Sequence, residues 1–245
     1  MQHALRLPLL GDDPESPFPA ASTALREPDG LLAFGGDLSP PRLLNAYRHG
    51  IFPWFSEGVP ILWWSPDPRM VFRTDAVRLS SRFRRALRSS SWRVRADTRF
   101  AAVVDACARS PRPGQHGTWI TSGMRAAYTT LHGLGHAHSV EVFEGDTLVG
   151  GIYGVGVGHM FFGESMFSGR SGGSKVALAA LAARLGDWGW PLLDAQVESP
   201  HLRSLGAEAW SRAVFLETIA GLVGVHEPPG PWTDRFGELP ASLLG

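Results

Sequence analysis

The chain has 245 residues, of which 44% are hydrophobic and 19% are charged, which excludes a disordered chain and supports one large domain, or one domain with a smaller companion. Its 23 basic residues equal its 23 acidic residues, so the protein does not coat nucleic acid over its whole surface. The single cysteine, Cys107, excludes an internal disulfide, and no apolar run reaches the roughly 20 residues of a membrane-spanning helix.

The first predicted helix begins after Ser39. This serine is a suitable N-cap, the two prolines that follow it fit the first helical turn, and Gly50 ends the helix. Residues 52–69 then combine three tryptophans with prolines, a pattern that predicts a rigid connection. We therefore place a domain boundary in this segment, between a small N-terminal α/β domain of residues 1–66 and a larger domain of residues 67–245.

Four further helices are predicted in the larger domain. Residues 80–90 predict a short basic helix with a serine cap, and residues 100–110 predict an amphipathic helix that stops at a proline. Residues 118–135 predict a loop that leads into a helix. Residues 175–189 predict a strongly periodic helix.

Strands alternate with these helices in the second half of the chain. Residues 137–168 predict three consecutive strands, with turns at Gly145-Asp146 and near residues 156–158. Residues 191–199 predict a buried strand. Strand hairpins followed by a helix and another strand indicate an α+β fold with a central, largely antiparallel sheet.

A run of arginines precedes the first of these strands. Between residues 78 and 99 there are eight arginines and one acid, Asp97, a local excess of seven positive charges. The arginines are Arg78, Arg82, Arg84, Arg85, Arg88, Arg93, Arg95 and Arg99. Such a stripe holds a polyanion locally through its phosphates, or it is the solvated face of a helix in a chain whose basic residues are nearly all arginine. The composition leaves both interpretations open.

Glu164 is a single carboxylate in the apolar stretch FFGESMFS. Burying an ionised carboxylate without a partner costs several kcal/mol. Glu164 is therefore either exposed at an edge or paired, and a cationic substrate is one possible partner.

Asp194 and Gln196 lie two residues apart in the predicted strand LLDAQ. Residues two apart in a strand face the same side, so the two polar side chains either bond a neighbouring loop or line a site. His136 and His138 also share a strand face, but no third ligand stands at a suitable spacing, so a structural role is predicted and no metal site is expected.

Eight segments occur in a fixed order across most of residues 31–215. They are LLAFGGDLSPPRLLNAYRHGIFPW, WWSPDPR, TWI followed by MRAAY, AHSVEVF, LVGGIYG, FFGESMFS, LLDAQ and HLRSLGA. Together they resemble the leucyl/phenylalanyl-tRNA-protein transferase family. The resemblance implies a small N-terminal domain and a C-terminal domain of the acetyltransferase-like (GNAT) fold.

The resemblance also implies the reaction and its partners. Leucine or phenylalanine moves from Leu-tRNA or Phe-tRNA to the N-terminal Arg or Lys of an acceptor protein, which marks that protein for degradation. Aminoacyl-tRNA is an activated ester, so no ATP, cofactor or metal is expected, and the chain has no GxxxxGK[ST] loop. We expect a cytoplasmic monomer, since the early acids and prolines at the N-terminus are unlike a signal peptide.

The resemblance assigns catalysis to Asp194 and Gln196. We expect the Gln196 carbonyl to align the attacking amine, while Asp194 holds Gln196 and stabilises positive charge. Glu164 is expected to contact the aminoacyl-adenosine end. Four aromatic residues are expected near the terminal adenosine: Tyr47, Trp54, Trp119 and Tyr128. Ser199 stands where many family members have Asn.

The side-chain pocket is expected to involve Phe161 and Met166, with Phe162 as a further candidate. Gly163 permits a bulge, through which residues of both strand faces reach one cavity. A pocket with methionine suits both a branched and an aromatic side chain.

The tRNA body is expected to bind a basic surface through its phosphates. The residues of this surface are Arg78, Arg82, Arg84, Arg85, Arg88 and Lys175. Two other functions remain to be weighed. RSGGSK matches the acetyl-CoA diphosphate loop [QR]xxGx[GA] up to Lys175, and Glu164 alone is compatible with a non-catalytic module that binds peptide N-termini.

Overall fold

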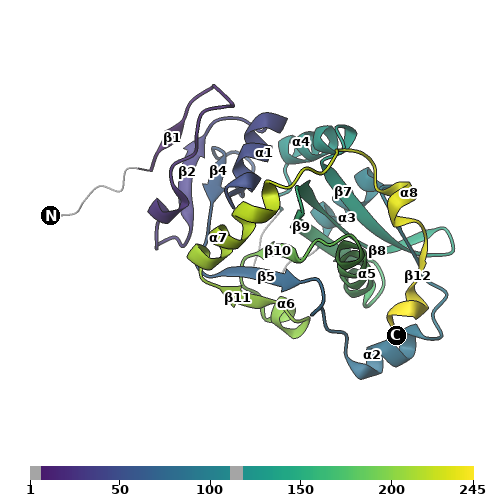
Figure 1. The fold of residues 1–245 in the computed structure, drawn as a ribbon. Coiled ribbons are helices and arrows are strands. Elements are labelled where there is room, and N and C mark those ends of the chain that lie inside the picture. Colours follow the sequence, from purple (N-terminus) through teal and green to yellow (C-terminus); the bar gives the residue numbers. More distant parts are fainter. Residues whose placement is uncertain (1–6, 111–117) are drawn as a thin grey trace.

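The computed structural model describes residues 7–110 and 118–245. It contains two sheets with helices packed around them (Figure 1). The smaller, N-terminal sheet has the order β1-β2-β4-β3. Its strands are β1 (Leu9–Leu10), β2 (Leu31–Gly35), β3 (Phe52–Pro53) and β4 (Leu62–Trp64).

The larger sheet has the order β11-β5-β10-β9-β8-β7-β6-β12. All neighbouring strands in it are antiparallel except β9 and β10, which are parallel. The strands are β5 (Arg69–Arg73), β6 (Arg93–Ala96), β7 (Ala137–Glu144), β8 (Thr147–Val157), β9 (Met160–Ser168), β10 (Leu192–Gln196), β11 (Glu208–Trp210) and β12 (Leu239–Pro240). The predicted α+β fold with a mixed, largely antiparallel sheet is confirmed.

The helices lie on both faces of the larger sheet. They are α1 (Pro40–Arg48), α2 (Ser81–Leu87), α3 (Phe100–Arg109), α4 (Ser122–Gly133), α5 (Gly173–Asp187), α6 (Pro200–Ser204), α7 (Arg212–Val223) and α8 (Thr233–Phe236), with 3-10 turns η1 (Ala21–Thr23) and η2 (Ala241–Leu244). No helix in the described part of the chain is both long and apolar enough to cross a membrane.

Alternation along β8 separates two hydrophobic clusters. Ile152 faces α5 and the C-terminal segment, whereas its neighbour Tyr153 faces α3 and α4, with its ring against Phe100 and Tyr128. The second face also packs against the N-terminal sheet, because Trp63 belongs to the same buried cluster. One continuous cluster therefore joins the two sheets, and a domain boundary at residue 66 stays a prediction.

Most of the predicted elements are confirmed. The helix after Ser39, the four later helices and the three-stranded meander are present, with turns at residues 145–146 and 158–159. Ser39 occupies the N-cap position, but its hydroxyl makes no capping hydrogen bond. Asp37 instead accepts a hydrogen bond from the Ser39 backbone amide at 2.7 Å.

The interpretation of residues 52–69 as a connection is wrong. This segment supplies β3 and β4 to the N-terminal sheet, and its last residue, Arg69, begins β5. Its prolines are compatible with these short strands because Pro53 lies on an edge strand of the sheet.

His138 has the predicted structural role. Its Nδ1 lies 2.8 Å from Asp97 Oδ2, and its ring stacks on Trp232 at a centroid distance of 3.8 Å. Asp97 also accepts from the backbone amides of Ser139 and Trp232. The hydrogen bond between Asp97 and the Trp232 amide connects the C-terminal segment to the end of β6.

Candidate active site

A cavity lies where β9 and β10 separate. Their parallel pairing ends at Phe162 and Asp194, yet β9 continues to Ser168 and β10 to Gln196. A cavity of about 460 Å³ opens at this point and is lined by Glu164, Asp194 and Gln196 among others. The structure thus brings the three polar residues that the sequence singled out into one site.

A bulge in β9 shapes the cavity. Gly154 pairs with Gly163 and Tyr153 pairs with Ser165, which leaves Glu164 as the extra residue. The faces of β9 therefore exchange: Phe162 lies in the cluster with Tyr153, whereas Met166 packs on the α5 side. The expected bulge beside Gly163 is present, and residues 163–166 all line the cavity.

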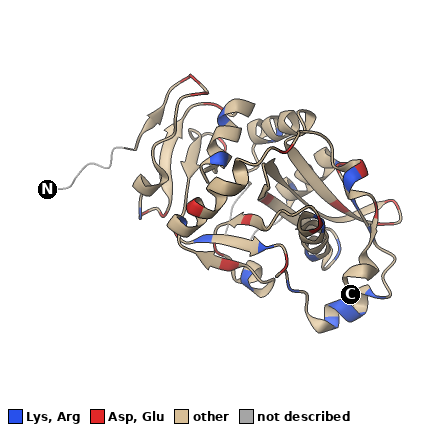
Figure 2. Cartoon of the chain, in the orientation of Figure 1, with Lys and Arg blue, Asp and Glu red and all other residues tan. Residues whose placement is uncertain are grey.

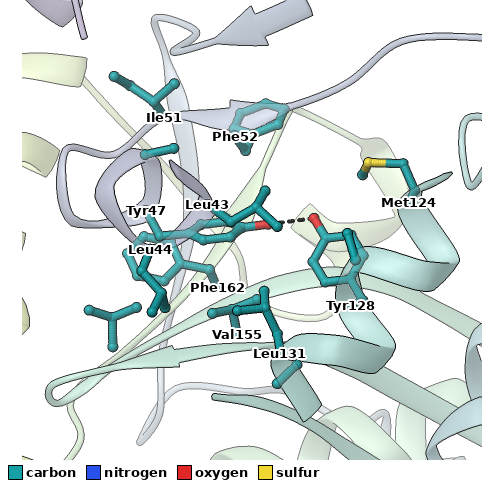
Figure 3. Packing of buried hydrophobic residues seen from close by; sticks show 14 of the residues in the cluster. Leu43, Leu44, Tyr47, Ile51, Phe52, Met124, Tyr128, Leu131, Val155 and Phe162 are labelled. Carbon is teal, nitrogen blue, oxygen red and sulfur yellow. Dashed lines mark hydrogen bonds between the residues drawn. The ribbon is translucent and has the colours of Figure 1, made fainter. Parts of the chain in front are cut away.

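Glu164 is buried, and its partners belong to the protein itself. Tyr47 Oη donates to Oε1 at 2.8 Å, Tyr128 Oη donates to Oε2 at 2.7 Å, and Gln196 Nε2 donates to Oε1 at 2.8 Å. The two tyrosine oxygens lie 2.5 Å apart (Figure 3). The sequence analysis indicated that a buried Glu164 needs a partner, but it did not identify these residues as its partners.

The oxygen contacts also bear on the protonation of Glu164. Tyr47, Tyr128 and Glu164 form a closed ring of three oxygen contacts, but an ionised carboxylate leaves only two hydroxyl protons for them. A protonated Glu164 carboxyl supplies the third, and in that state it donates to one of the two tyrosine hydroxyls instead of accepting from it. Burial raises the pKa of Glu164 to about 7, against the opposing effect of the hydrogen bonds from Tyr128, Tyr47 and Gln196. Burial likewise raises the pKa values of Tyr47 and Tyr128, so both remain neutral donors.

Gln196 has an unusual backbone conformation. Its φ is 61°, a left-handed value that is uncommon for residues other than glycine, and it follows an irregularity in the pairing of β10 with β5. Its backbone amide donates to Asp194 Oδ1 at 2.9 Å. The side-chain amide points to Glu164, so Glu164, and not Asp194 as expected, orients the Gln196 side chain.

Asp194 is paired with Arg69, a residue that the sequence analysis missed. Arg69 Nε and Nη2 lie 2.8 and 2.6 Å from the two carboxylate oxygens, and both side chains are fully buried. The expected stabilisation of a developing positive charge by Asp194 is therefore weakened by a cation already in place. The acid in the predicted buried strand LLDAQ could have indicated such a partner, because the argument that a buried Glu164 needs a partner applies equally to Asp194.

The apolar wall of the cavity comes from several elements. Phe72, Ile152, Met166, Leu178 and Leu193 line it. Two expected pocket residues do not. Phe161 lies beneath in the α5 cluster with its ring 5.6 Å from that of Trp232, and Phe162 packs on Tyr47 at 5.2 Å. Both point into the core because residues before the bulge keep the regular strand alternation.

The four expected aromatic residues divide into two pairs. Trp54 and Trp119 line the cavity and offer ring surface to a ligand. Tyr47 and Tyr128 are fully buried, so neither can stack on a base, and they act on Glu164 instead. Ser199 also lines the cavity, at the start of α6.

The basic surface is centred on α2, where Figure 2 shows positive segments beside the C-terminus. Arg78, Arg82, Arg84, Arg85 and Arg88 are exposed, and within residues 7–110 and 118–245 none of them makes an ion pair. Lys175 lies 5.8 Å from the centre of the Phe83 ring, beside α2. The stripe is smaller than the sequence suggests, because Arg93 and Arg95 both bind Glu238.

The start of α5 differs from an open anion site. The Gly173 amide donates to the Arg170 carbonyl, and the Ser174 amide donates to Ser168 Oγ, both at 2.9 Å. Two of the first helical amides are therefore engaged within the protein. This weakens the diphosphate-loop interpretation of RSGGSK.

The cavity combines an apolar wall with a fixed amide and two buried carboxyl groups, a combination that is typical of enzyme active sites. Two family models match the chain: leucyl/phenylalanyl-tRNA protein transferase over residues 71–220, and the N-terminal domain of that family over residues 36–67. The chain belongs to the leucyl/phenylalanyl-tRNA-protein transferase family and is therefore an aminoacyltransferase.

The sequences of individual relatives match this chain over nearly its whole length. A leucyl/phenylalanyl-tRNA–protein transferase of Xanthomonas euvesicatoria pv. vesicatoria is 70% identical over 236 residues, or 96% of this chain and 94% of that protein. One of Xanthomonas axonopodis pv. citri is 69% identical over 243 residues, or 99% and 98%. Among solved structures, L-PGS from Bacillus licheniformis is 9% identical with a TM-score of 0.37 over 69% of this chain and 53% of that one, too low for structural inference.

Proposed function

We propose that the protein transfers leucine or phenylalanine from aminoacyl-tRNA to the N-terminal Arg or Lys of an acceptor protein. The product carries a new peptide bond and an N-end rule degradation signal. The observation that carries the proposal is the cavity between β9 and β10, in which an apolar wall lies beside Gln196 and Glu164. The cavity therefore has an apolar region for the side chain of the transferred amino acid next to a polar region for the reacting ester.

The proposed chemistry needs positioning more than a strong base. The α-amine attacks the ester carbonyl, a C–N bond forms, the C–O bond to the ribose breaks, and the released ribose oxygen takes up the proton that the attacking nitrogen loses. An α-amine has a pKa near 7.7–8.0 in model peptides, so roughly a tenth or more is neutral at pH 7. Holding amine and ester together contributes about 7–11 kcal/mol in favourable cases.

Gln196 is proposed to align the amine through its carbonyl oxygen. Its Nε2 donates to Glu164, which fixes the amide orientation and directs Oε1 to another donor. Glu164 acts through Gln196 and meets the aminoacyl-adenosine end when substrate is bound. Trp54 and Trp119 stack on the adenosine, where each base stack contributes about 1–3 kcal/mol.

The α2 surface is proposed to hold the tRNA acceptor stem. Five exposed arginines without ion-pair partners in the described part of the chain support this, together with Lys175. We further propose a GNAT-like larger domain from residue 67, supported by the mixed sheet with helices on both faces, and a cytoplasmic monomer.

The test is transfer without ATP. Purified protein is incubated with Leu-tRNA and a peptide that begins with Arg, and the mass of the peptide is measured by mass spectrometry. We expect the mass of one leucyl residue to be added. Matched peptides beginning with Asp or with an acetylated Arg should remain unchanged. An unmodified Arg peptide would refute the proposed function.

A further inference from the structure

Arg69 is held from several sides at the junction of the two sheets. Nε and Nη2 bind both oxygens of Asp194, and Nη1 donates to the Gly50 carbonyl at 2.9 Å. The guanidinium also lies between two rings, 4.8 Å from the centre of Phe52 and 4.6 Å from that of Phe215. A group fixed by three hydrogen bonds and two rings has little freedom to move.

Asp194 has both oxygens occupied. Oδ1 accepts from Arg69 Nε and from the Gln196 backbone amide, and Oδ2 accepts from Arg69 Nη2. The carboxylate is thus engaged within the protein, and its side chain is fully buried. Its visible effect is on the backbone of Gln196, whose φ of 61° needs such a restraint to persist.

The Gly50 contact reaches the other side of the same network. Gly50 follows α1, and its amide donates to the carbonyl of Tyr47, whose hydroxyl donates to Glu164. One guanidinium thus connects both residues that orient the Gln196 amide: Asp194 acts on its backbone, and Glu164 on its side chain.

We propose that Arg69 is a positioning residue for aminoacyl transfer, which acts through Asp194 to fix the backbone of Gln196 and through Gly50 to fix the end of α1. The inference rests on the proposed role of Gln196. Arg69 itself lies outside the cavity lining and touches no reacting atom. Its contribution is to the alignment of the amine, so it affects turnover more than tRNA binding.

Two substitutions separate charge from geometry. Arg69→Met removes both, and we expect kcat to fall about 100-fold, the size of effect that a misplacement near 1 Å can produce. KM for Leu-tRNA should change by less than about threefold, because the binding surfaces are untouched. Arg69→Lys keeps the charge but loses the two-pronged contact, so it should restore part of the rate.

Arg42 offers a matched control. It is equally buried, and its Nη2 donates to the carbonyls of Gly11 and Asp13, neither of which lines the cavity. Arg42→Met should lower the melting temperature but leave the kcat of the folded protein unchanged. An equal loss of kcat in both Met variants would overturn the proposal, since it would show a general effect of losing a buried arginine.

A double-variant cycle tests the route through Asp194. In an Asp194→Asn background only the route through Gly50 remains to be lost, so Arg69→Met should reduce kcat there by clearly less than the roughly 100-fold expected for Arg69→Met alone. An undiminished 100-fold cost there would refute the route.

A readout without turnover keeps this inference separate from the proposed function. The side-chain amide signal of Gln196 in a ¹⁵N spectrum, assigned by its loss in Gln196→Ala, should shift or broaden in Arg69→Met and keep its position in Arg42→Met. An unchanged signal in Arg69→Met would overturn the positioning role. Failure of the wild-type protein to transfer leucine would instead refute the proposed function.

Discussion

Replacing Glu164 with Gln should make the free energy of unfolding of the protein less dependent on pH. In the folded protein burial raises the pKa of Glu164 to about 7 from the ordinary 4.5. The folded state therefore binds a proton more tightly than the unfolded state, so this group's stabilising contribution is fully present below pH 4.5 and is lost as the pH rises through about 7. The pKa difference of 2.5 corresponds to about 3 kcal/mol of folding free energy.

The measurement is urea unfolding of wild-type protein and Glu164→Gln between pH 4 and pH 8. Subtracting the two curves removes the contribution of Glu141, whose pKa burial also raises to about 7. As the pH rises from 4 to 8, the free energy of unfolding of the variant should increase by about 3 kcal/mol relative to that of the wild type, with most of the change between pH 4.5 and 7. Glu217→Gln, on an exposed position of α7, controls for the substitution itself. Parallel curves for wild type and Glu164→Gln would refute the assignment of a protonated Glu164.

Three predictions concern catalysis and binding. Gln196→Glu should reduce kcat at pH 7, since it removes the donor to Glu164 and adds a carboxyl group beside two others; a variant as fast as the wild type, with a rate that climbs through a new acidic pKa, would favour general-base catalysis instead. Met166→Ala should widen the apolar part of the cavity and raise kcat/KM for phenylalanine relative to that for leucine, by a factor within about 10–200; equal loss with both donors would argue against a role in the pocket. Combined alanine substitution of three exposed α2 arginines should weaken tRNA binding and flatten its salt dependence without slowing reaction with a short aminoacyl-adenosine analogue, and an unchanged salt slope would count against this surface. These residues are Arg82, Arg84 and Arg85.

The sequence by itself determined the secondary structure around the site. Periodicity placed the three-stranded meander and α5, because strand and helix repeats are local properties of the backbone. The apolar surroundings of Glu164 in the sequence also indicated that a buried Glu164 needs a partner, since the cost of a lone buried carboxylate does not depend on the fold. The same argument applies to Asp194, for which no partner was predicted. The bulge at Gly163 was foreseeable for the same local reason.

Only the tertiary structure decided which partners these carboxyl groups have. Tyr47 lies 117 residues from Glu164 in sequence and Arg69 lies 125 residues from Asp194, so no local pattern joins them. The residues meet because β5 pairs with β10 and because Tyr47 of α1 packs on Phe162 of β9, an arrangement set by the burial of whole strands and helices. Tyr47 and Tyr128 were expected to meet a base and instead bind Glu164, because the packing that buries their rings turns both hydroxyls toward this carboxyl group.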